Sequence, residues 1–242
     1  MKIGITIPVL NNFHGLLDSI NSMRSKYPLQ FCIVDNKLVP KSVAEAWNQG
    51  IDFLFSQGCK YVLVVNDDVL FTSFTIDNLV AVMKEKKAGI VTGNNVQGEY
   101  KNPVQVLTMR SVPEEVYAPN PDFSCFLLSK RTWDTVGRFD ENFKPAYFED
   151  NDYHARIALA GLSAIRCSSA PYFHFGSVTA NAMRRTEAEE KERAASFVRN
   201  RVYFKMKWGY LPVDTEVEMR ERYYATPFND VVLTIRDCPI LT

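Results

Sequence analysis

Short apolar runs alternate with segments of helical periodicity over the first hundred residues. Runs rich in β-branched and aliphatic residues predict strands at 2–9, 29–36, 60–68 and 88–96. Apolar positions at helical spacing predict helices at 13–27, 42–58 and 73–87. The middle helix has clear boundaries, because Ser42 and Glu45 are spaced as a capping box and Gly58 follows its last turn. This alternation predicts an α/β protein with a mostly parallel central sheet flanked by helices.

The pattern is less regular after residue 100. Residues 104–111 and 123–137 suggest further strands and a short helix, and 148–161 predicts a helix with an acidic first turn. Residues 163–177 predict a strand followed by a loop, and 181–207 predict a highly charged helix. We therefore expect one domain over residues 1–180, with a helical C-terminal extension over residues 181–242 packed on it.

Composition narrows the class of protein. The 242 residues are 46% hydrophobic, which is enough for one large core or at most two small ones. Lys+Arg and Asp+Glu both number 28, so no overall basic field marks nucleic acid or an anionic membrane as the main partner. None of the five cysteines forms a CxxC pair, so we expect reduced, buried thiols at Cys32, Cys59, Cys125, Cys167 and Cys238.

The start of the chain has no recognisable targeting segment. Its first apolar run is short and is broken by Pro8 and two asparagines, which is unlike a signal peptide. No run approaches the roughly 18 apolar residues of a membrane helix. We expect a cytoplasmic protein, and peripheral attachment to a membrane stays open.

Two adjacent acids, Asp67 and Asp68, end a strongly apolar run. Buried carboxylates are usually paired or bound to a metal. Like charges about 4 Å apart repel by roughly 4 kcal/mol at an effective dielectric of about 20, so carboxylates approach a diphosphate only through a cation. Mg²⁺ typically binds one or two carboxylates plus substrate phosphates. The pair therefore suits a metal–diphosphate complex, and the alternative is that both acids cap the following turn.

Polar residues also follow the first two predicted strands, at 8–12 and 35–36. The carboxyl ends of parallel strands share one edge of a sheet, where ligands bind in folds of this kind. We therefore expect these residues and the two acids to lie at one cleft.

A second acidic cluster and a histidine occur later in the chain. Glu149, Asp150 and Asp152 could supply a general base at the mouth of a cleft, or they could be ordinary first-turn acids favoured by the helix dipole. His174 lies between aromatic residues, where it could join carboxylates as a ligand of Mn²⁺ or serve a structural role. The run 199–210 mixes cations with aromatic residues, which could bind an anion or stack on a sugar, or form a solvated helix face.

Taken in order, these segments resemble the family-2 glycosyltransferases, which are nucleotide-diphospho-sugar transferases with the GT-A fold. The matching segments are ITIPVLNN, IVDN, AEAWNQGIDFLFSQGCKYVLVVNDD, VGRFDENFKPAYFEDNDYHARIALAG and PYFHFGS. The resemblance covers about residues 3–180, which would form the catalytic domain. One position departs from the family pattern, since Asn66 stands where the first acid of an Asp-x-Asp triplet is usual.

The resemblance implies a role for each matching residue on the donor side. The residues that would line the nucleotide pocket or position the nucleotide are Pro8, Asn11, Asp35, Asn48, Asn66 and Asp67. Asp68 would bind Mn²⁺ or Mg²⁺, with His174 as a further ligand.

On the acceptor side, the resemblance implies that Asp150 is the general base, with Glu149 and Asp152 as rivals. Asp140 would shape the acceptor site. The implied reaction is metal-dependent transfer of a sugar from a nucleotide-diphosphate sugar to an acceptor hydroxyl, with inversion. A glycan or polysaccharide intermediate is the first choice of acceptor.

Three other functions stay open. A protein side chain or a DNA base could be the acceptor, and for DNA the basic patch would be Arg184, Arg185 and the cations of 199–207. The chain could also bind a nucleotide sugar without catalysis. A nucleotidyltransferase ranks lower, because the loop PVLNNFHG has no Lys or Arg to hold a triphosphate.

Overall fold

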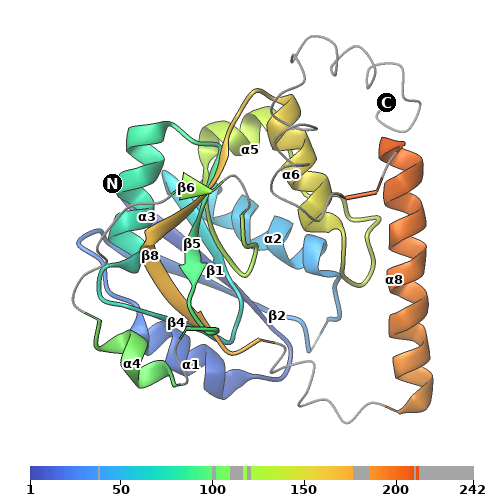
Figure 1. Cartoon of the computed structure of the whole chain (residues 1–242), viewed down its shortest axis with the longest axis horizontal. Helices are drawn as coiled ribbons and strands as arrows, with labels where there is room; N and C mark the ends of the chain where they lie inside the picture. Colours follow the sequence, from blue (N-terminus) through green and yellow to red (C-terminus); the bar gives the residue numbers. More distant parts are fainter. Residues whose placement is uncertain are drawn as a thin grey trace.

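The computed structural model describes residues 1–37, 39–99, 102–109, 117–118, 121–176, 186–209 and 211–212. The strands within these ranges are β1 (Ile3–Val9), β2 (Leu29–Asp35), β3 (Tyr61–Val65), β4 (Val69–Phe71), β5 (Ile90–Asn95), β6 (Tyr117–Ala118), β7 (Cys125–Ser129) and β8 (Ala164–His174). The helices are α1 (Phe13–Ser22), α2 (Val43–Ser56), α3 (Thr75–Lys86), α4 (Pro103–Leu107), α5 (Lys130–Val136), α6 (Glu149–Leu159) and α8 (Glu187–Trp208). Figure 1 shows the sheet in the middle and α8 along one side of the molecule.

The strands form one mixed sheet in the order β2-β1-β3-β7-β5-β8-β4, and β6 also pairs with β8. β1 runs parallel to β2 and β3, and β5 runs parallel to β8. β7 is antiparallel to both β3 and β5, and β4 and β6 are antiparallel to β8. The α/β class is confirmed. The expected parallel order is interrupted in the middle, because β7 starts at the edge where β3 and β5 end and runs back between them.

Each strand predicted in the first hundred residues is present, and so is each helix. The α2 boundary is the clearest case: Ser42 accepts from the backbone of Glu45, and the Glu45 carboxylate accepts from the backbone of Ser42. One expectation beyond residue 100 is wrong. Residues 103–107 form a helix, because Asn102 caps it and its first position is a proline. β4 was not anticipated, since three apolar residues after two acids give little periodic signal.

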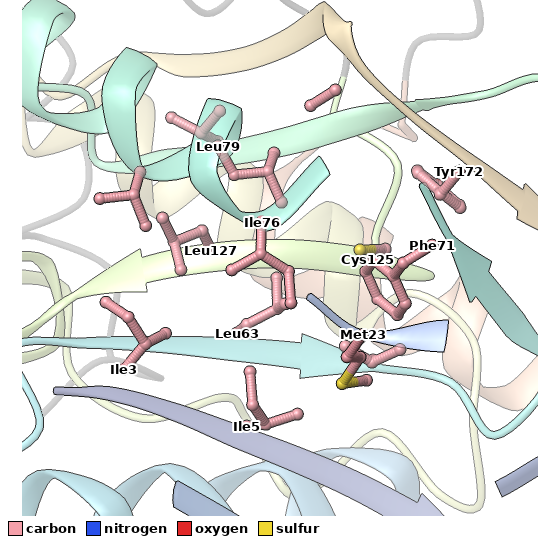
Figure 2. Close-up of a cluster of buried hydrophobic side chains, with 14 of the residues drawn as sticks. Ile3, Ile5, Met23, Leu63, Phe71, Ile76, Leu79, Cys125, Leu127 and Tyr172 are labelled. Atoms are coloured by element: carbon pink, nitrogen blue, oxygen red, sulfur yellow. The ribbon is translucent and has the colours of Figure 1, made fainter. Parts of the chain in front are cut away.

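The core lies on both faces of the sheet. Alternate residues of β3 separate the two sides: Leu63 and Val65 face α1 and α3, whereas Val62 and Val64 face α2, α5 and α6. Figure 2 shows the first side, where side chains from β1, β3, α3 and β7 meet. Burial on both faces explains why the strands are almost continuously apolar.

The close approach of α2 to β1 depends on small residues. A Cβ at Gly50 would overlap the side chain of Thr6, and one at Gly4 would lie 2.9 Å from Leu54 Cβ. Glycine at these two positions therefore lets the backbone of α2 lie directly on β1, and this close contact fixes the position of β1 relative to α2.

The C-terminal extension begins as a capped helix. Thr186 and Glu189 form a capping box at the start of α8, and Gly209 ends it in the left-handed conformation. Phe204 packs with Phe143 and Phe148 of the segment that precedes α6. Most of the rest of the expected extension, residues 213–242, lies outside the described residues.

No helix in the described part of the chain is both long and apolar enough to cross a membrane. The four described cysteines, Cys32, Cys59, Cys125 and Cys167, are free thiols, and Cys238 is not among the described residues.

Candidate active site

Three parallel strands bring their polar ends to one edge of the sheet. Val9 of β1 is in register with Asp35 of β2, and the backbone N–H of Asn36 donates to the carbonyl of Val9 at 2.7 Å. The Asn12 side chain donates to the carbonyl of Asp67 at 3.1 Å. The predicted convergence of these strand ends is therefore confirmed.

β4 and β8 place His174 against Asp68. Val69 pairs with His174 in an antiparallel register, and the N–H of Phe175 donates to the carbonyl of Asp68 at 3.0 Å. The two side chains meet with His174 Nε2 2.9 Å from Asp68 Oδ1. Asp68 is 6% exposed and His174 17% exposed, so the pair is largely shielded from solvent.

The charge around His174 favours its protonated form when no cation is bound. Burial opposes the imidazolium, but the hydrogen bond to Asp68 and the nearby carboxylates of Asp122 and Asp67 outweigh it and raise the pKa of His174. The same concentration of negative charge would attract a metal ion.

The donor set fits a hard or borderline divalent cation. Asp68 offers a carboxylate oxygen and His174 an imidazole nitrogen, both suited to Mn²⁺. The described residues contain no group of three or more His, Cys, Asp or Glu placed to hold a metal. An ion held by this pair would therefore complete its coordination with water or with oxygens of a substrate, as Mg²⁺ does when it binds phosphates.

A cavity of about 850 Å³ opens over this edge. Its sheet-side wall includes Pro8, Asn11, Asn36, Asn66, Asp67, Asp68 and His174. Lys41 and, from α8, Arg193 also line it and supply positive charge, beside Glu189 and Glu192 of the same helix. Arg193 is held by Tyr147 Oη at 3.0 Å and by Glu190 at 3.0 Å.

A second cavity, of about 720 Å³, adjoins the first. Its lining includes Asp122, Ser124, Glu149, Asp150 and Arg201. The two cavities share the wall formed by Val43, Trp47, Asn66, Ala146 and Tyr147. They are therefore two parts of one cleft, with the Asp68–His174 pair in one part and the Glu149–Asp150 pair in the other.

Glu149 and Asp150 begin α6 in different surroundings. Glu149 is 5% exposed, and within the described structure its Oε2 has no hydrogen-bond partner. Burial and the neighbouring Asp150 and Asp152 raise the pKa of Glu149 to about 8. Asp150 is half-buried, burial raises its pKa, and its Oδ1 accepts from the N–H of Asn151 at 2.8 Å. Near neutral pH, Glu149 thus carries a proton.

Asp152 does not belong to the cleft. It is fully buried, and its carboxylate contacts Lys207 at 2.7 Å, Trp208 at 3.0 Å and Arg156 at 2.9 Å. Both of its oxygens therefore bind donors of the protein itself. The geometry removes Asp152 from the rivals for general base, and Glu149 and Asp150 remain.

Asn48 also lies away from the lining of both cavities. It is fully buried, and its amide donates to the Phe139 carbonyl at 2.9 Å and to Glu141 at 2.8 Å. Its side-chain oxygen accepts from the N–H of Phe139 at 2.8 Å. Asn48 therefore fastens the loop before α6 to α2, and contact with a nucleotide is not open to it in this arrangement.

Two further predicted residues lie beside the cleft rather than in its lining. Asp35 ends β2 and accepts from the N–H of Lys37 at 2.8 Å, while its neighbour Asn36 faces the first cavity. Asp140 binds Lys207 at 2.6 Å and Tyr203 at 3.0 Å. Asp140 thus anchors α8 to the segment that precedes α6.

Asp122 is a cleft residue that the sequence pattern did not reveal. It lies just before β7, and its carboxylate accepts from the N–H of Ser124 at 2.9 Å. The N–H of Asn66 donates to the Ser124 carbonyl at 2.9 Å, which ties this segment to the end of β3. Polar residues that follow strands predicted the cleft. Asp122 precedes its strand and reaches the same edge only because β7 runs antiparallel.

No family model matches the chain. A curated galactofuranosyl glycosyltransferase of Leishmania donovani is 25% identical over 186 residues, which is 61% of this chain and 43% of the relative. The chain thus spans less than half the length of the curated relative that it matches.

Solved structures share the architecture over most of the chain. Mannosyltransferase PcManGT from Pyrobaculum calidifontis matches with a TM-score of 0.55 and 14% identity, over 98% of this chain and 73% of that one. S. aureus TarS 1–349 matches with a TM-score of 0.52 and 14% identity, over 97% of this chain and 79% of that one. The catalytic domain of Drosophila β1,4-galactosyltransferase 7 matches with a TM-score of 0.51 and 15% identity, over 79% of each chain.

The fold is the GT-A glycosyltransferase fold. The resemblance that the sequence carried is therefore confirmed at the level of architecture. In this GT-A fold, the cleft lies at the carboxyl ends of β1, β2 and β3, where an α/β sheet places its ligands.

Proposed function

We propose that this chain is a family-2 glycosyltransferase that moves a sugar from a nucleotide-diphosphate sugar to an acceptor hydroxyl. The observation that carries the proposal is the cleft with the Asp68–His174 pair in one part and the Glu149–Asp150 pair in the other. Solved relatives support this choice of substrates. PcManGT was solved with GDP-Man and Mn²⁺, and a mutant of the Drosophila enzyme with manganese, UDP-Gal and xylobiose.

The donor would occupy the cavity over the strand ends. Asp68 and His174 would hold Mn²⁺ or Mg²⁺, which when bound supplies positive charge to the departing diphosphate. Lys41 and Arg193 line the same cavity and would add positive charge to the diphosphate site. Pro8, Asn11 and Asn36 would form the nucleotide wall.

The acceptor would occupy the second part of the cleft. Asp150 is the candidate that can take the proton of the acceptor hydroxyl, because Asp152 is bound by protein donors and Glu149 is protonated near neutral pH. Glu149 would instead donate a hydrogen bond to an acceptor oxygen from its unpartnered Oε2. The acceptor and the diphosphate would then occupy different parts of the cleft, and this arrangement supports the proposal of attack opposite the leaving group, with inversion.

A glycan is the acceptor that fits this cavity best. Trp47, Phe123, Phe148 and Phe197 line it, and aromatic faces pack against sugar rings. Protein or DNA-base acceptors are weaker alternatives. For DNA, Lys207 is unavailable because it is buried between Asp140 and Asp152. A binder without catalysis would retain donor affinity but show no turnover.

The first experiment measures hydrolysis and binding of a panel of nucleotide sugars, with and without Mn²⁺. We expect one donor to be used only with metal, and Asp68→Ala to abolish that use. Asp18→Ala is the matched control, since Asp18 is an exposed carboxylate of α1 that lines neither cavity. Metal-independent or absent donor binding by a folded wild-type protein would reject the proposal.

A further inference from the structure

Helix α8 has an apolar stripe on the side that faces away from the domain. Its inner side is formed by the buried residues Ser196, Asn200, Phe204 and Lys207. On the outer side, Val198, Val202 and Met206 are 60%, 54% and 67% exposed. Residues four apart lie one above another on a helix, so these three form a continuous stripe. Figure 1 shows α8 along one side of the molecule, and the exposure of these three residues places the stripe on its solvent side.

The stripe is bordered by positive charge. Arg201 and Lys205 lie on one side of it and Arg199 on the other, and all three are exposed. Arg199 is also paired with Glu192 at 3.5 Å, so the positive charge is concentrated on the side of Arg201 and Lys205. The four glutamates of α8 lie in its first two turns, and residues 193–208 contain no acid. The C-terminal half of the helix is therefore apolar at its centre and basic at its borders.

We propose that this face of α8 docks on the surface of an anionic lipid membrane. A membrane interface supplies an apolar layer for the stripe and negative headgroups for the flanking cations. A second copy of the chain fits less well, because pairing two such faces would bring Arg199, Arg201 and Lys205 of both copies together. The chain's balanced net charge does not oppose docking, since the basic residues are concentrated locally.

The placement of the second cavity gives this docking a consequence, which rests on the proposed function. Phe197 and Arg201 of α8, and Leu211 and Pro212 just after it, line the cavity that holds Glu149 and Asp150. A membrane against α8 would therefore lie beside the acceptor part of the cleft. The acceptor class that fits is a sugar hydroxyl carried on a lipid headgroup.

Docking can be tested with the full chain and vesicles of phosphatidylcholine, with or without phosphatidylglycerol. We expect co-sedimentation with the anionic vesicles only, weakening as salt is raised, because surface attraction is screened. Val202→Glu/Met206→Glu should reduce the partition coefficient by roughly tenfold or more, since two charges replace the buried stripe. Val104→Glu is the matched control, because Val104 is 63% exposed on α4 and should leave binding unchanged.

Several results would overturn the docking proposal. These are equal binding to neutral vesicles, no binding to anionic ones, or undiminished binding by the double variant. A dimer that the same double variant abolishes would assign the face to a second copy. If the glutamate variant does not fold, Val202→Ser/Met206→Ser takes its place. Donor hydrolysis without an acceptor should survive in either variant. Its absence in the wild type would reject the proposed function and leave vesicle binding as a separate result.

Discussion

At the scale of single residues, two neighbouring acids differ because their surroundings differ. Glu149 and Asp150 share the first turn of α6 and line the same cavity. Glu149 is more deeply buried, with one oxygen unpartnered among the described residues and a pKa raised to about 8. Burial raises the pKa of both carboxyl groups, that of Glu149 to about 8. We propose that Glu149 is the proton-bearing member of the pair and Asp150 the base.

This assignment predicts opposite effects of two conservative substitutions. Glu149→Gln should keep most of the turnover, because an uncharged amide resembles a protonated carboxyl group. Asp150→Asn should lower kcat by about 10²–10⁴-fold, the usual contribution of a general base. Both are measured by transfer to a glycan acceptor, with donor binding as the control for folding. A larger loss in Glu149→Gln than in Asp150→Asn would make Glu149 the base, and equal losses would also contradict the assignment.

At the scale of elements, α8 holds the segment that presents the acids. Tyr147 and Phe148 have φ values of 81° and 76°, a left-handed conformation that is strained for side chains of this size. Asn200 of α8 donates to the carbonyls of Ala146 and Tyr147 at 2.8 and 3.2 Å. The helix therefore supports a strained turn directly before Glu149 and Asp150.

The same helix ends in a buried ion network. Lys207 lies 2.6 Å from Asp140 and 2.7 Å from Asp152, and it is almost completely buried. Lys207→Met should destabilise the protein by about 3–5 kcal/mol, since it leaves buried carboxylates without their shared cation. Lys205→Met, at an exposed position on the same helix, should change stability by less than about 0.5 kcal/mol. Urea unfolding of the two variants tests this, and equal stability would show that α8 is not anchored by the network.

At the scale of the whole molecule, two buried groups make stability depend on pH. The folded state keeps the Glu149 proton up to a pKa of about 8, whereas the unfolded chain loses it near 4.5, so stability falls as pH rises between these values. Burial lowers the pKa of His154 from 6.5 to about 4, so the unfolded chain takes up that proton first and stability rises with pH across this window. The two effects oppose each other below about pH 6.5. Above it the effect of Glu149 remains, and His174, whose pKa is raised from 6.5 in the folded state, acts in the same direction.

We therefore expect the free energy of unfolding to fall as pH rises from about 6.5 to 8, by at most about 1.4 kcal/mol per pH unit for each of Glu149 and His174. Glu149→Gln should make this slope shallower, because it removes one of the two titrating groups. Urea unfolding followed by tryptophan fluorescence at several pH values measures both slopes. A slope as steep in the variant as in the wild type would contradict the contribution of Glu149.

Much of the architecture was predictable from local patterns. Ser42 and Glu45 predicted where α2 begins. The apolar runs of β1, β2 and β3 predicted strands whose polar ends share one edge of the sheet. These features depend on neighbours within a few residues, so periodicity and capping reveal them. The strand predicted after residue 103 was wrong. The alternating valines of Pro103–Leu107 favour a strand, whereas the cap at Asn102 and the proline favour the helix that forms.

The sequence by itself determined which elements form and which side chains could carry chemistry. The tertiary structure decided which of those side chains reach the cleft and in what state. The antiparallel direction of β7 places Asp122 at the cleft, and the pairing of β4 with β8 places His174 against Asp68. Lys207 of α8 binds Asp152 in a buried ion network, away from the cleft. Access and ionisation depend on partners that are distant in the chain, and only packing brings those partners together.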